Sequence, residues 1–354
     1  MTSLLGVYEI ARKLAALTPQ VATFNMGLGV RNPRFDTGAI VTGLRLLFVP
    51  PRHRRSLFAA LLALCMAIPL PALGAEEEEE GPPEPEDIEL VTKDGVLLKA
   101  TWYASRKKTE AVPVILLHQY RGSRADYRDL ALYLQVEKEH AVIVPDLRGH
   151  GDSLKWERGG DKGSFDVERL RPEDFDLMAS QDVEAVKRFL VRKNNDKELN
   201  IERLCLVGAE MGALVGIRWS WGDWAWGSQR ASTVKQGRDV KALTLISPEL
   251  RFKNLQASQL ATPPIAGQVA IQIVAGANDP KVVKNARQLN NLVKKLYVDK
   301  REQMLFLDIG YKTRLQGTKM LGEKLGLEER IATFIELRAV KQPFSWTERK
   351  APVP

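Results

Sequence analysis

The residues best suited to chemistry lie where an apolar run ends between two glycines. The run from Leu204 to Val207 favours a buried β-strand, and the residues after Gly212 favour a helix. Gly208 and Gly212 flank Glu210 with the spacing of a nucleophile elbow, a tight strand-to-helix turn that lifts one side chain to the top of a sheet. Glycines suit those positions because a sharp turn leaves no room for Cβ atoms. A serine stands at the tip of the usual motif, so Glu210 leaves the chemistry of this turn open.

Glu210 is one of several polar side chains that follow predicted strands. Those that come just past the end of an apolar run are His118, Asp146, Glu210, Ser247, Asp279 and Tyr311. Active sites in open parallel sheets lie at the carboxyl ends of the strands. We therefore expect these side chains to gather at one edge of a sheet.

The apolar pattern predicts the elements that would position them. Residues 88–92 and 96–105 alternate in hydrophobicity around an Asp-Gly turn, which indicates an antiparallel hairpin. Nearly continuous apolar runs predict buried strands at 112–118, 141–145, 201–207, 240–246, 268–275 and 303–307. Helices are predicted at 125–136, 172–192, 211–219 and 325–335, and after residue 280, where Val282, Ala286, Leu289 and Val293 share one face. Residues 154–172 are polar and glycine-rich, which indicates a loop. The predicted class is α/β, with a mostly parallel central sheet, an antiparallel N-terminal hairpin and helices on both faces.

Five motifs, in this order, carry a resemblance to a known family. They are Leu116 to His118, the loop 146–153, the elbow at 208–212, Ile246 to Pro248, and Gly276 to Asp279. Through them, residues 88–338 resemble the α/β-hydrolase superfamily, and most closely its monoacylglycerol-lipase and serine-aminopeptidase-like branch. The resemblance implies a serine nucleophile at the elbow, an acid after a later strand and a histidine after the last strand. It also implies that His118, Asp146 and His150 have structural roles in their loops.

The implied triad is incomplete in this chain. Asp279 fits the acid, with Glu249 as an alternative, but Glu210 replaces the serine and Tyr311 stands at the position implied for the histidine. A tyrosine, with an ordinary pKa near 10, is a poor base at neutral pH. We therefore do not expect Ser-His-Asp hydrolysis. Three functions stay open. We favour a catalytically degenerate protein that binds a small ligand or a protein partner. The alternatives are an active esterase- or peptidase-like hydrolase with non-standard catalytic residues and a purely structural envelope protein.

The oxyanion hole implied by the resemblance is also altered. Its donors would be the backbone amides of Gln119 or Tyr120 and of Met211, and Gln119 replaces the glycine of the family. Glu210 lies at the start of a predicted helix, where an exposed negative charge is stabilised by ~0.3–1 kcal/mol. We hypothesise that its carboxylate folds back, accepts these amides and blocks the site.

Further polar and aromatic residues near the site have two interpretations. Ser247 precedes a proline, which is typical of a strand end, and tryptophans at 219, 221, 224 and 226 either pack at a helix end or line a pocket for a sugar or lipid. Arg121 and Arg124 either hold an anionic ligand or face solvent. Residues 251–264 are too few for a large cap, so we expect a site that is shallow or covered by residues 154–172 and 220–239.

The excess of positive charge is concentrated at the N-terminus. The formal net charge is +8, and residues 1–75 contain eight basic but only two acidic residues. The remainder is thus close to neutral, and nucleic-acid binding is not indicated. The two cysteines lie at 65 and 205, no Cys/His cluster has zinc-site spacing, and we expect no metal or cofactor.

The same region has the pattern of an export signal. Basic residues at 52–55 precede an apolar run at 57–70 and small residues up to Ala75, which predicts a signal peptide at 49–75. We expect an exported protein, in the periplasm, the cell envelope or outside the cell. The apolar run is shorter than the ~20 residues of a membrane span, so an uncleaved signal would be the sole anchor. Residues 1–48 are interpreted as an over-extended gene start or a disordered extension, 76–87 as an acidic, proline-containing linker, 88–340 as the hydrolase domain and 341–354 as a C-terminal tail.

Overall fold

The computed structural model describes residues 81–226, 235, 237–297, 304–322 and 324–350. The predicted signal peptide and the extension before it lie outside the described residues, as does the first part of the linker. None of the helices among the described residues is long and apolar enough to cross a membrane.

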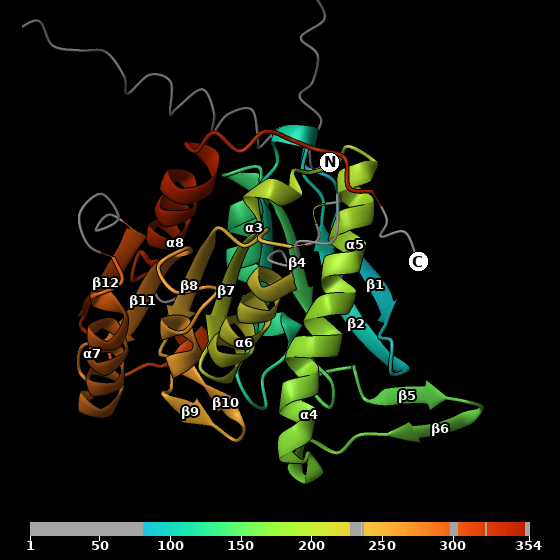
Figure 1. Ribbon diagram of the computed structural model, residues 1–354, viewed down its shortest axis with the longest axis horizontal. Coiled ribbons are helices and arrows are strands. Elements are labelled where there is room, and N and C mark those ends of the chain that lie inside the picture. Colours follow the sequence, from blue (N-terminus) through green and yellow to red (C-terminus); the bar gives the residue numbers. More distant parts are fainter. Residues whose placement is uncertain (1–80, 227–234, 236, 298–303, 323, 351–354) are drawn as a thin grey trace, which may run out of the picture. The chain divides into compact units, whose positions relative to one another are not determined.

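A mixed sheet runs through the described part of the chain (Figure 1). Its strands are β1 (Glu86–Val91), β2 (Val96–Tyr103), β3 (Pro113–Leu117), β4 (Ala141–Pro145), β5 (Lys155–Arg158), β6 (Asp161–Ser164), β7 (Cys205–Ala209), β8 (Ala242–Ile246), β11 (Ala270–Gly276) and β12 (Leu305–Tyr311). Their order is β12-β11-β8-β7-β3-β4-β2-β5-β6, and β1 also pairs with β2. A separate two-stranded ribbon joins β9 (Arg251–Phe252) and β10 (Leu255–Gln256).

The centre of the sheet is parallel and buried. Every residue of β3, β4, β7, β8 and β11 is buried, which explains why these strands are continuous apolar runs in the sequence. The hairpin of β1 and β2 is antiparallel, as predicted, and β2 pairs antiparallel with β4. The predicted α/β class with a mostly parallel sheet is confirmed.

Helices cover both faces of this sheet (Figure 1). They are α3 (Arg128–Val136), α4 (Pro172–Leu177), α5 (Glu184–Asn195), α6 (Met211–Trp226), α7 (Pro280–Lys294) and α8 (Leu327–Ile335). Leu190 of α5, Leu214 of α6 and Leu289 of α7 belong to one apolar cluster. Leu134 of α3 and Ile331 of α8 belong to a second cluster on the other face. The predicted apolar face of α7 is confirmed, since all four of its residues are buried.

Several predicted boundaries need correction. The predicted loop 154–172 contains the hairpin of β5 and β6, turned by Gly159 and Gly160, which extends the sheet beyond β2. Its side chains are mostly exposed, so the segment carries no apolar alternation. The helix predicted at 172–192 is interrupted by a π-helical segment, Met178–Val183, between α4 and α5. The elbow helix reaches Trp226, and the last strand extends to Tyr311.

The segment 341–350 lies against the end of α5. The Trp346 indole donates to the Asn194 carbonyl at 3.1 Å. Arg349 is only 7% exposed and pairs with Glu202 and Asp239. Asp239 also pairs with the buried Lys187, at 2.7 Å. The segment thus completes a buried cluster of charges within the domain.

Candidate functional site

The elbow keeps its geometry although its tip residue has changed. Glu210 lies between β7 and α6 with φ of 47°, in the left-handed region, and its amide donates to the Ile246 carbonyl at 2.9 Å. A Cβ at Gly208 would come 2.6 Å from the Ala213 nitrogen, and one at Gly212 would come 2.5 Å from the His118 carbonyl oxygen. Both glycines are therefore required by close backbone approach, as the sequence predicted, and Glu210 occupies a strained backbone position.

The backbone amides implied as oxyanion donors lie around this turn, on the loop after β3 and at the start of α6. Within the described residues, none of the amides of Gln119, Tyr120 and Met211 donates a hydrogen bond to a protein acceptor. The Glu210 carboxylate accepts no hydrogen bond from these residues either, so the hypothesised plug of the oxyanion hole is not formed. The Glu210 carboxylate lies beside Gly317 instead, where Oε1 is 2.8 Å from the place a Cβ would take.

The environment of Glu210 disfavours its ionised form. Burial raises the pKa of its carboxyl group above the ordinary value, the charge of Glu249 raises it further, and Lys319 partly opposes both. Burial likewise raises the pKa of Glu249, which Lys281 partly opposes. Glu210 at the elbow and Glu249 after β8 are therefore both easier to protonate than exposed carboxyl groups.

Asp279 occupies the position predicted for the acid, in the loop after β11. Its two carboxylate oxygens have different partners. Its Oδ1 accepts the amides of Lys281 and Val282 at 3.0 and 3.1 Å and so caps α7. Its Oδ2 accepts the side-chain amide of Gln316 at 2.7 Å. Gln316 immediately precedes Gly317, which contacts Glu210. Gln316 is therefore the side chain that contacts Asp279, and the residue after it lies beside Glu210.

Tyr311, expected at the histidine position, has a different acid as the partner of its hydroxyl. It is the last residue of β12, and its hydroxyl donates to Oδ2 of Asp308 at 3.1 Å. Burial raises the pKa of Tyr311 well above the ordinary value, and the Asp308 charge adds to this. The Tyr311 hydroxyl thus bonds Asp308 and not Asp279; Gln316, which sequence reasoning missed, donates to Asp279. The signal would have been a polar side chain followed by glycine, later in the same loop.

Two sets of hydrogen bonds hold the residues that follow Gln316 in place. The Gly317 amide donates to Oγ of the buried Ser247 at 3.1 Å, so Ser247 has a structural contact here. The amide and hydroxyl of Thr318 both donate to Oε1 of Gln119, at 2.9 and 2.8 Å. Gln119 thus ties the loop after β3 to the loop after β12.

Comparison with solved structures identifies the fold that carries this site. No family model matches the chain, and no curated protein matches it. Among solved structures, a thermostable carboxyl esterase from Bacillus coagulans in complex with glycerol is similar, with TM-score 0.51 and 14% identity over 73% of this chain and all of its own. An esterase from Pyrobaculum calidifontis has TM-score 0.50 and 13% identity, over 72% of this chain and 86% of its own. This chain has the α/β-hydrolase fold.

In this α/β-hydrolase-fold protein, the other motif residues bind their own loops together. His118 is fully buried; its Nδ1 donates to the Gln119 carbonyl at 2.8 Å, and its Nε2 accepts the Leu147 amide at 3.0 Å. Asp146 accepts the amides of Arg124 and Asp152, at 2.6 and 2.9 Å, and pairs with the Arg124 guanidinium. The Arg124 guanidinium is thus already paired with an acidic side chain of this protein.

The tryptophans of the fold's elbow helix have packing contacts. The indole nitrogens of Trp219, Trp221 and Trp224 donate to Glu184, to the Pro263 carbonyl and to the Val240 carbonyl, respectively. Trp226 is 63% exposed. Three of the four residues therefore tie α6 to its neighbours.

Proposed function

We propose that this protein is a catalytically degenerate member of the α/β-hydrolase fold that binds a small ligand or a protein partner. The observation that carries the proposal is the contact between Gln316 and Asp279. A carboxamide can hold the position of a histidine, but it neither takes up nor releases a proton at neutral pH. A nucleophile at the elbow would thus have no proton carrier beside it.

The retained parts of the elbow support binding. The amides of Gln119, Tyr120 and Met211 have no acceptor among the described residues, so they would donate to the oxygen of a ligand. Glu210 and Glu249 lie near the same turn and would repel an anion. The ligand group that suits this setting is a neutral carbonyl, on a small molecule or on a loop of a partner.

The second candidate is a hydrolase in which Glu210 acts directly. The raised pKa of Glu210 favours it, because a general acid or base works best when its pKa approaches the working pH. The proposal of ligand binding would fail if the wild-type protein turned over p-nitrophenyl esters and Glu210→Gln abolished that turnover. We expect no turnover above the buffer rate and no labelling by a fluorophosphonate probe. Glu249→Gln is the matched control, since it removes the neighbouring carboxylate and leaves the elbow unchanged.

We further propose that the protein is exported, on the strength of the signal-peptide pattern at 49–75. Sequencing the N-terminus of the natively expressed protein would test both export and the gene start. A first residue near position 76 is expected. Peptides from residues 1–45 in the native protein would contradict the interpretation of an over-extended gene start.

A further inference from the structure

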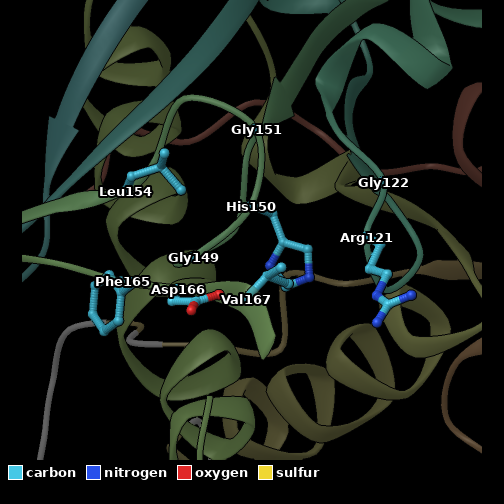
Figure 2. A pocket seen from close by; sticks show the side chains of 9 residues that line it. All are labelled: Arg121, Gly122, Gly149, His150, Gly151, Leu154, Phe165, Asp166 and Val167. Carbon is cyan, nitrogen blue, oxygen red and sulfur yellow. The ribbon is translucent and has the colours of Figure 1, made fainter. Parts of the chain in front are cut away.

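A cavity of about 510 Å³ lies beside the loops that follow β3, β4 and β6 (Figure 2). Its side-chain walls are Arg121, His150, Leu154, Phe165, Asp166 and Val167, and three glycines complete it. Its volume falls within the range of roughly 300–1,000 Å³ for ligand pockets. Glu210, Asp279 and Gln316 do not line it, so it is separate from the elbow.

One residue of the cavity wall, His150, carries a buried polar atom without a hydrogen-bond partner among the described residues. His150 is 2% exposed, and its Nδ1 lies 3.0 Å from the Arg148 carbonyl oxygen. Because a carbonyl only accepts, Nδ1 carries the proton and Nε2 is left as an acceptor. Nε2 has no hydrogen-bond partner within the part of the chain that the structure describes. Figure 2 shows the imidazole between the labelled Val167 and Arg121, within the ring of lining side chains.

The histidine stays neutral under ordinary conditions. Burial lowers the pKa of His150 to about 4, and the neighbouring His118, with ring centroids 5.1 Å apart, lowers it as well. A buried acceptor without a donor costs about 1–3 kcal/mol, so the cavity favours an occupant that supplies an O–H or N–H group. A carboxylate or phosphate ester dianion would present only lone pairs to Nε2.

The remaining walls narrow the class of occupant. Leu154, Phe165 and Val167 are apolar, which suits the C–H face of a ring. Arg121 and Asp166 supply a donor and an acceptor, and each is already paired, with Glu168 and Arg169 respectively, so neither demands an ionic ligand. We propose that this cavity binds a small neutral ligand that carries several hydroxyl groups, such as a polyol or a monosaccharide, with one hydroxyl donating to Nε2 of His150.

The proposal can be tested by filling the cavity without removing any hydrogen bond. Leu154 is 39% exposed, so Leu154→Trp would enlarge a wall residue and leave the buried core intact. Leu337→Trp is the matched control, because Leu337 is 37% exposed and does not line the cavity. Saturation-transfer NMR with glycerol, myo-inositol and D-glucose as probes would measure binding. We expect saturable binding of at least one probe, weakened at least tenfold by Leu154→Trp and unchanged by Leu337→Trp.

A second variant tests the hydrogen bond itself. His150→Asn keeps a side-chain amide that can donate to the Arg148 carbonyl, but it lacks an atom in the place of Nε2. We expect about a tenfold loss of affinity for the same probe. The ¹⁵N shift of His150 Nε2 in the wild-type protein should move on binding. Absence of saturable binding for all three probes, or equal binding by wild type and Leu154→Trp, would overturn the proposal and leave solvent water as the occupant. Neither result bears on ester turnover at the elbow, so the two proposals fail separately.

Discussion

Rebuilding a proton relay at the elbow is the most direct test of how this scaffold relates to a hydrolase. The double variant Glu210→Ser with Gln316→His would supply a nucleophile and an imidazole. The bond between Nε2 of Gln316 and Oδ2 of Asp279 is 2.7 Å, which is the length expected of the bond that orients a catalytic histidine. The amides of Met211 and Gln119 have no acceptor among the described residues and could receive the oxyanion.

The size of the effect follows from which groups act together. A serine without a base, or a histidine without a nucleophile, leaves only binding and oxyanion stabilisation, because triad members act as a unit. A positioned general base contributes about 10²–10⁴-fold in rate. We therefore expect the double variant to hydrolyse p-nitrophenyl acetate about 10²–10⁴-fold faster than Glu210→Ser or Gln316→His alone.

The control comes from the position that the sequence favoured. Glu210→Ser with Tyr311→His places the imidazole near Asp308 instead of Asp279, so this variant should stay at the level of the single variants. Steady-state ester hydrolysis would be measured for all four proteins, and labelling of the introduced serine by a fluorophosphonate for the three that carry Glu210→Ser. Equal activity of the two double variants would refute the assignment of Gln316. No gain in either, with native-like circular dichroism, would refute the view that the elbow scaffold is intact.

Three further predictions concern stability, measured by urea denaturation. Gly212→Ala should destabilise the fold by about 3 kcal/mol, because its Cβ would meet backbone oxygens. In the same helix, a Cβ at Gly222 would meet no described atom within 4 Å, so Gly222→Ala should stabilise the fold by about 0.5–1 kcal/mol. Burial lowers the pKa of His140 to about 3. The unfolded chain therefore takes up this proton first as pH falls below about 6.5, and stability drops with it. Between pH 7 and 5, wild type should lose about 2 kcal/mol more than His140→Gln. Arg349→Ala should cost about 3 kcal/mol by breaking a buried ion pair, and the exposed neighbour Lys350→Ala should cost nothing measurable.

The central fold could be predicted because its signals are local. Buried parallel strands must be apolar along their whole length, and the elbow needs glycines at Gly208 and Gly212 whatever stands between them. The partner of Asp279 could not be found in this way, since Gln316 lies 37 positions along the chain. The length of β12 decides which residue contacts Asp279. That strand continues to Tyr311, which keeps the tyrosine within the sheet and leaves the contact to the following loop.

The same reasoning explains what was missed in the cavity. The hairpin of β5 and β6 is mostly exposed, so burial imposed no alternating pattern on its residues. Only the Gly159-Gly160 pair was available as a turn signal. His150 could be assigned to a loop from its motif, but the sequence holds no sign that one ring nitrogen lacks a partner. Whether that nitrogen finds a donor depends on how the surrounding loops are placed in three dimensions.

The bond of Gln119 to Thr318 gives the elbow region a built-in reporter of opening. Both donors of Thr318 end on the same oxygen, so one rotation of the Gln119 side chain releases them together. The Thr318 amide would then exchange its hydrogen with solvent. Its exchange rate therefore measures how often the loops after β3 and β12 part. A ligand that wedges these loops open would accelerate exchange at this amide, and a ligand that bridges them would slow it.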